Sequence, residues 1–177
     1  MKKIITKIVL AASVLIAVVC AFAGCGGSKD YNLTEATFFK VMYNMVYYPE
    51  QYLGAKVSLD CFVYEIEDVK TGEQFVCGVR KCSSGIGCTC GNDTIIGFIL
   101  DYNGVIPAAR NQSEDSSDKT WIHISGSLVS AEKVWVNVYS YQDGEPTDNI
   151  EQINFYRFNV ETLEEIDGTG LKYYVTN

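Results

Sequence analysis

The sequence predicts a mainly β fold: a small antiparallel barrel or sandwich of five to six strands with one amphipathic helix near its N-terminus. One apolar stripe with helical spacing, a series of strand-like runs separated by turns, and a length of 177 residues lead to this prediction. Residues 31–177 are enough to bury one core. Periodicity alone does not distinguish an OB-like barrel from a sandwich.

Residues 1–24 have the features of a bacterial lipoprotein signal peptide. Three lysines precede an apolar run over residues 8–23 that only Ser13 interrupts. Such a run would form a helix of about 24 Å, which is shorter than the ~30 Å hydrocarbon core. Phe22-Ala23-Gly24-Cys25 resembles the lipoprotein box, in which the cysteine is lipidated and becomes the first residue. We therefore expect a lipid anchor at Cys25 on the extracytoplasmic face of the cell membrane.

The mature chain is expected to be acidic. Loss of the three lysines leaves 11 basic and 22 acidic residues, a net charge of −11. Nucleic-acid binders need a basic surface, so no nucleic-acid partner is expected. Residues 25–32 are predicted to be a flexible tether, and residues 33–177 to form a single domain.

The elements follow from local patterns. Residues 34–46 are predicted to form the helix, because Phe38, Val41, Met42, Met45 and Val46 share one face and Thr34 can cap its start. Strands are predicted at residues 56–68, 73–81, 94–102, 121–130, 134–141 and 153–160. Residues 171–175 either add an edge strand or stay loose. Gly97 suggests a bend or a close backbone approach inside its strand.

Several short motifs between residues 45 and 130 occur in a recognisable order. They are Tyr52-Leu53-Gly54, Lys56-Val57, Arg80, Cys90-Gly91-Asn92-Asp93, Gly97-Phe98, Trp121 and Gly126. This order resembles a family of uncharacterised bacterial extracytoplasmic lipoproteins, and the OB-like C-terminal domain of a permease-associated family of unknown function. The resemblance implies an OB-like barrel, a thiol-bearing loop before the third strand, and no established activity. The chain departs from that pattern where Thr89 separates two cysteines and where Cys77 and Cys82 are added.

The loop between the second and third predicted strands concentrates cysteines. Cys77, Cys82, Cys88 and Cys90 could close a tetrahedral site for zinc or copper, because soft thiolates select these metals. Cys82, Cys88 and Cys90 alone could supply three ligands. The spacing is not that of a zinc ribbon.

Two other roles for the cysteines stay open. A two-residue turn at Thr71-Gly72 would place Cys61 directly opposite Cys82, which allows a disulfide. Free or redox-active thiols are the third possibility. Five cysteines remain after Cys25, so they cannot all pair within one chain.

The functional prediction is a membrane-anchored binding module outside the cytoplasm, with a metal-binding cysteine loop, beside a membrane permease or another envelope protein. The alternative is a disulfide-stapled structural or interaction domain that binds a protein or a glycan and no metal. The only histidine, His123, is expected at a rim of the sheet rather than in a catalytic set. No nucleophile, base and orienting group are visible together, so an enzyme is not expected.

Overall fold

The computed structural model describes residues 29–82, 94–110, 118–142, 145–172 and 174–175. One α-helix, α2 (Glu35–Tyr47), is followed by the 3-10 turn η1 (Pro49–Gln51). The strands are β1 (Asp30–Leu33), β2 (Lys56–Glu67), β3 (Gln74–Cys82), β4 (Thr94–Asp101), β5 (Trp121–Leu128), β6 (Val134–Gln142), β7 (Glu145–Glu165) and β8 (Tyr174–Val175).

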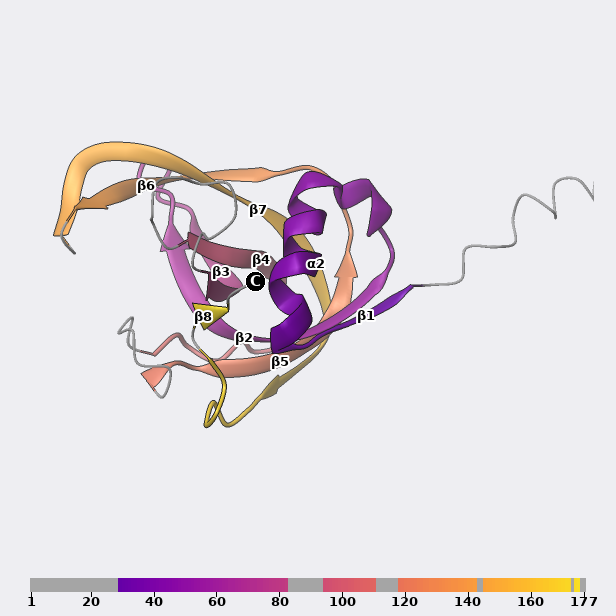
Figure 1. Ribbon diagram of the computed structural model, residues 1–177. Coiled ribbons are helices and arrows are strands. Elements are labelled where there is room, and N and C mark those ends of the chain that lie inside the picture. The colour runs from indigo at the N-terminus through magenta and orange to yellow at the C-terminus, as the bar shows by residue number, and fades with distance from the viewer. Residues whose placement is uncertain (1–28, 83–93, 111–117, 143–144, 173, 176–177) are drawn as a thin grey trace, which may run out of the picture.

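Five strands close a ring, which confirms the predicted small, mainly β barrel (Figure 1). Around the ring β2 pairs with β3, β3 with β4, β4 with β7, β7 with β5, and β5 with β2. Four of these pairings are antiparallel, whereas β4 and β7 run parallel. The ring is thus mostly antiparallel, as predicted, with one parallel seam between β4 and β7.

Three further strands extend the ring. β1 lies parallel to β2, β8 adds an edge pair to β3, and β6 pairs only with β7 among the described strands. β1 was expected to be part of the flexible tether, but Asp30 pairs with Lys56 and Leu33 with Leu59. The folded domain thus begins at Asp30, three residues before the predicted boundary.

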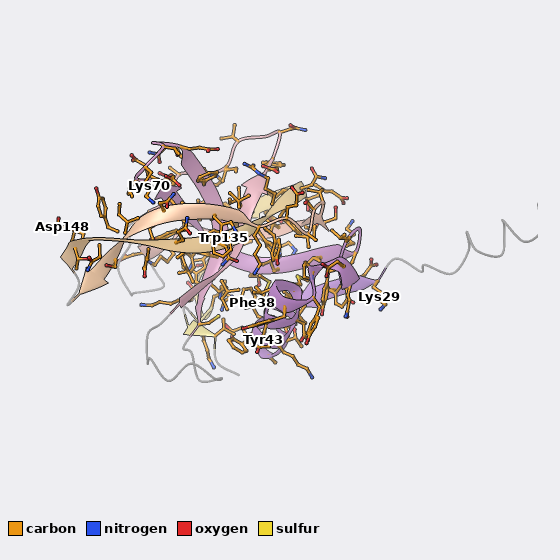
Figure 2. All side chains as sticks on the ribbon, turned by 90° about the horizontal axis from the view of Figure 1, so that it is seen from above. Lys29, Phe38, Tyr43, Lys70, Trp135 and Asp148 are labelled. Atoms are coloured by element: carbon orange, nitrogen blue, oxygen red, sulfur yellow. The ribbon has the colours of Figure 1, made fainter. Side chains whose placement is uncertain are left out.

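The hairpin of β6 and β7 projects away from the barrel (Figure 1). Figure 2 shows Asp148 near its tip and Trp135 closer to the barrel. One face of the hairpin turns Val136 and Phe155 into the core, and the other leaves Trp135, Tyr139 and Ile150 exposed. β7 is longer than the predicted strand because its first half forms this hairpin and its second half forms barrel wall.

Helix α2 covers part of the barrel with the apolar stripe predicted from its sequence. Phe38, Phe39, Met42 and Met45 are buried in a core cluster with Leu59, Ile124 and Phe158. At its start the Thr34 amide donates to Thr37 Oγ1 at 3.0 Å. At its end Tyr156 Oη donates to the Val46 carbonyl at 3.1 Å, which ties the helix to β7.

Gly97 meets the backbone of β3, as its position in the strand predicted. A Cβ at Gly97 would lie 2.0 Å from the Gly78 carbonyl oxygen and 2.7 Å from Val79 Cα. Only a residue without a side chain allows β4 to approach β3 this closely. Gly97 lies one residue before the parallel pairing of β4 with β7 begins at Phe98.

Candidate functional site

The two described cysteines of β3 point to opposite faces of the sheet. Cys77 and Cys82 are separated by an odd number of positions, and side chains alternate along a strand. Cys77 lies in the core cluster that contains Trp121, whereas Cys82 lies in the cluster that contains Phe38. Cys88 and Cys90 lie outside the described residues. The structure therefore does not bring Cys77 and Cys82 together for one metal ion.

Burial keeps these thiols protonated. Desolvation raises the pKa of Cys77 to about 12 and that of Cys82 to about 11, although Arg80 opposes the rise at Cys82. Desolvation also raises the pKa of Cys61. The thiolate is the form that attacks and that binds metal, so the three side chains act as small apolar groups in this state.

The turn between β2 and β3 differs from the predicted one. Glu67 pairs with Gln74, so the loop is longer than Thr71-Gly72 and the register moves by two residues. Phe62 faces Val79, and Cys61 is therefore not directly opposite Cys82. The predicted register is wrong because Asp68 organises a wider turn, accepting hydrogen bonds from the amides of Lys70 and Thr71 at 2.9 Å. Cys61, Cys77 and Cys82 are all free thiols, and a Cys61–Cys82 bond stays a prediction.

No metal site is visible in the part of the chain that the structure describes. No three His, Cys, Asp or Glu side chains there are grouped to hold an ion. His123 Nδ1 lies 2.6 Å from Asp60 Oδ1, across the antiparallel pairing of β5 with β2. Both side chains are partly exposed. This pair is an isolated polar contact on the outer wall.

Arg80 is a charged side chain enclosed by the fold, with an exposed fraction of 2%. Its guanidinium lies 4.8 Å from the centroid of the Trp121 ring and 5.6 Å from that of Phe38. It donates to Glu35 Oε1 at 3.2 Å and to the Lys172 carbonyl. Burial lowers the pKa of Arg80, and Glu35 opposes that effect. Arg80 therefore joins α2, the barrel and the C-terminal segment.

A pocket of about 370 Å³ lies where helix α2, β4 and β7 meet. We call it the β4–β7 pocket; Tyr43, Val46 and Tyr47 of α2, residues 95–97 of β4 and residues 152–156 of β7 line it. Its volume falls at the small end of the range typical of ligand pockets. Among the described residues, those that line the pocket are aliphatic, aromatic or amide, and none of them is charged at neutral pH.

Hydrogen bonds and ring contacts hold the walls of the β4–β7 pocket. Tyr43 and Tyr47 are one helical turn apart, with ring centroids 4.5 Å apart. The interaction with Tyr47 raises the pKa of Tyr43, so its phenol stays protonated. On the opposite wall Gln152 Nε2 donates to Asn137 Oδ1 at 3.2 Å, and Asn137 Nδ2 donates to Asp68 Oδ2 at 2.7 Å. These bonds orient polar groups beside an apolar floor.

Sequence reasoning missed the β4–β7 pocket. It assigned the stripe of α2 to the core, which holds for Phe38 and Met42, and it gave no role to the exposed Tyr43 and Tyr47 beside that stripe. The only signal available was the cluster of three tyrosines at residues 43, 47 and 48 on one short helix end. Nothing local links them to residues 95–97 or 152–156.

Comparison with known proteins assigns the family. Residues 22–155, more than half of the chain, match the DUF1980 C-terminal domain. The chain belongs to this family. This agrees with the expected likeness to a C-terminal domain of unknown function. The DUF1980 match includes β1 to β6 and the part of β7 that lines the β4–β7 pocket up to Phe155.

The DUF1980 chain is also similar to a longer bacterial protein. It is 26% identical over 104 residues to "UPF0703 protein YcgQ" of Bacillus subtilis (strain 168). That match covers 58% of the chain and 31% of the relative, so the chain spans under a third of this relative's length. No solved structure matches the chain. Within the described residues, no helix combines the length and apolarity needed to cross a membrane.

Proposed function

We propose that this DUF1980 domain is a lipid-anchored binding module on the extracytoplasmic face of the cell membrane. The basic start, the apolar run and the Ala23-Gly24-Cys25 sequence support the anchor. β1 begins at Asp30, so four residues separate Cys25 from the folded domain. Such a short connection would keep the domain at the membrane surface, within reach of a permease or another envelope protein.

The order of strands around the ring supports an OB-like barrel. In chain order the first three ring strands, β2, β3 and β4, form a meander, and β5 and β7 close the ring on its other side. OB folds are five-stranded Greek-key barrels that serve as binding scaffolds. A scaffold of this kind carries its function in one attached site, and here we assign that role to the β4–β7 pocket.

The β4–β7 pocket is the observation that carries the proposal. It combines an apolar floor, two exposed tyrosines and two amide side chains, which suits binding of a neutral ligand. The thiols described above are buried and protonated, and the described residues that line the pocket include no base beside a nucleophile. Binding of a partner is therefore favoured over catalysis.

Photo-cross-linking in cells tests this function. A photoreactive phenylalanine analogue replaces Tyr47, which lines the pocket, or Tyr48, an adjacent residue of similar exposure that does not. We expect a light-dependent adduct of defined mass at position 47 and little or none at position 48. Equal adducts at both positions, or none at either, would contradict a binding role for the β4–β7 pocket. Labelled fatty acid incorporated into the wild type and lost in Cys25→Ser tests the anchor.

A zinc or copper site is the second candidate. Cys82 is the last residue of β3, directly before the segment that contains Cys88 and Cys90. Cys77 faces the other side of the sheet. The structure thus favours three thiolate ligands over four, and binding would require Cys82 to lose its proton.

Metal analysis with thiol counting separates this candidate from the disulfide alternative. A soluble form spanning residues 26–177, purified without chelators, is expected to hold about one zinc or copper ion if the site exists. Cys88→Ser and Cys90→Ser should lose the ion and Cys77→Ser should keep it. No metal, with four thiols paired after denaturation, would support a stapled domain instead.

A further inference from the structure

The β4–β7 pocket follows the edges of two strands. Residues 152–156 of β7 all line it in succession, and so do residues 95–97 of β4. Successive side chains of a strand point to opposite faces of the sheet. Ile95 and Ile153 pack against one core cluster, whereas Ile96 and Tyr156 belong with the other, so the lining includes both faces of the two strands and the pocket runs along their edges.

The ladder between β4 and β7 ends at this pocket. Their parallel pairing joins Phe98 to Tyr156 and continues to Asp101 and Asn159. No ladder pair joins residues 95–97 to residues 152–155, all of which the structure describes. β4 keeps β3 on its other side and β7 keeps β6. The two strands therefore separate into a fork, and each turns one edge towards the pocket.

Unpaired strand edges present rows of backbone N–H and C=O groups at regular spacing. An extended peptide satisfies both kinds of group at that spacing, as it does when it adds to a sheet edge. A glycan carries hydroxyl groups but no alternating donors and acceptors at the repeat of a strand. The fork therefore favours a polypeptide as the ligand.

We propose that the fork accepts a short, extended and uncharged segment of a partner protein, inserted as a strand between β4 and β7. This inference deepens the proposed function, on which it rests. The described residues that line the pocket carry no charge, so a charged side chain in the segment would lose its hydration without gaining a partner among them. Ile95, Ile96 and Ile153 would contact its apolar side chains, and Tyr43 and Tyr47 would cover it from α2.

The geometry also limits the length of the segment. The fork is closed at one end by the Phe98–Tyr156 pair, so the segment enters from the end near Thr94 and stops or turns at Phe98. Residues 95–97 offer an edge three residues long, and a strand advances about 3.3 Å per residue. The inserted part of the segment is therefore about three residues long. Since β4 and β7 are parallel, the inserted strand has the same direction relative to both.

Selection of displayed random heptapeptides on the soluble form spanning residues 26–177 tests the proposal. We expect selected peptides to contain a core of about three uncharged residues, with apolar side chains among them. Asn154→Lys, which places a charge in the fork, should weaken their binding by at least tenfold. Asn159→Lys is the matched control: it makes the same change on β7 beyond the fork, where Asn159 pairs with Asp101, and should leave binding unchanged.

N-methylation of the selected peptide measures the strand geometry directly. Alternate amides of an inserted strand face β4 and β7, so methylation of either alternate set should weaken binding about tenfold. If methylation of only one alternate set of amides, or of neither set, weakens binding, the peptide is not inserted between the two strands. Selection of peptides that are insensitive to Asn154→Lys would likewise overturn the insertion.

The outcomes of the cross-linking and peptide tests, taken together, distinguish this inference from the proposed function. If the Tyr47 adduct forms in cells but the cross-linked partner segment is helical or folded, the binding role stands and the strand inference fails. If the adduct is a second copy of this chain, and the soluble form dimerises in a way that Asn154→Lys abolishes, the partner assignment is wrong. If the peptide test fails and no adduct forms at Tyr47, both fail.

Discussion

The two halves of β7 show how one strand serves two purposes. From Tyr156 onward it is barrel wall, paired with β4 as far as Asn159 and with β5 from Phe158 to Glu165. Before Tyr156 it pairs with β6 and leaves its other edge on the β4–β7 pocket. The closed half is held by neighbouring strands, whereas the open half makes no ladder pair with a described strand along the edge that faces the pocket. A binding edge placed at the end of a closed ladder is held in position without being blocked.

The largest expected effect concerns the closed barrel of which this half of β7 is one wall. Arg80→Ala should lower the free energy of unfolding by about 3 kcal/mol, because it removes a buried guanidinium that contacts two aromatic rings, Glu35 and the Lys172 carbonyl. Denaturant unfolding measures this change. Arg157→Ala, which breaks an exposed pair with Asp101, is the control and should cost less than about 1 kcal/mol. Equal costs would show that Arg80 does not join the elements around it.

The boundary between the two halves can be tested at Gly97. Gly97→Ala forces a Cβ against the Gly78 carbonyl, so we expect a loss of about 2 kcal/mol and a weaker light-dependent adduct at Tyr47. Gly72→Ala, at a φ of 73° with open space around it, should cost about 1 kcal/mol without affecting the adduct. An unchanged adduct in Gly97→Ala would show that the close approach of β4 to β3 at Gly97 does not shape the pocket.

Asp68, which follows β2, connects the barrel to the β6–β7 hairpin that contains the open half of β7. Hydrogen bonds from Asn137, and from the amides of Lys70 and Thr71, hold the pKa of Asp68 below its usual value. The folded state thus favours the carboxylate, and this stabilisation is present above about pH 4 and is lost as the pH falls below it. Asp68→Asn should therefore be less stable than the wild type at pH 7, and the difference should shrink below pH 4.

Unfolding curves measured between pH 2 and pH 7 check this dependence. Asp101→Asn, which changes a carboxylate in an exposed pair, provides the comparison and should give a smaller difference at neutral pH. A difference between wild type and Asp68→Asn that persists unchanged at pH 2 would contradict the assigned role of the ionised carboxylate.

Amide hydrogen exchange should show the smallest effect and compares the two halves directly. Amides of Phe158 and Asn159 lie between β4 and β5, whereas alternate amides of residues 152–155 face the pocket. We expect the pocket-facing amides to exchange about tenfold faster or more. Addition of a selected peptide should slow them. Uniform protection along β7 in the free protein would show that the fork is closed.

Local patterns were enough to predict the barrel, because its strands alternate or form apolar runs and its helix has one stripe. β1 was not predicted, since Asp30-Tyr31-Asn32-Leu33 is short and half polar and becomes a strand only by pairing with β2. The β2–β3 register was missed because the Asp68 side chain closes a wider turn than Thr71-Gly72 suggests. In both cases the deciding interaction lies outside the pattern used to predict the element.

The candidate site was harder to predict than the fold. The cysteines drew attention by their number, yet Cys61, Cys77 and Cys82 are buried in the two core clusters on either side of the sheet. The β4–β7 pocket is assembled from three segments far apart in the chain, and its defining feature is a missing pairing between two strands. A single sequence shows which residues can form strands, but not where two neighbouring strands part.

β1 has a mechanical consequence for a domain tethered at Cys25. A pull from the membrane would enter the fold through Asp30 and act along β1, which lies parallel to β2 with four consecutive residue pairs. Ladder hydrogen bonds lie across the strand direction, so such a load would shear all four pairs at once instead of opening them one by one. β1 would thus resist forces at the proposed anchor, and would protect the barrel and the β4–β7 pocket from them.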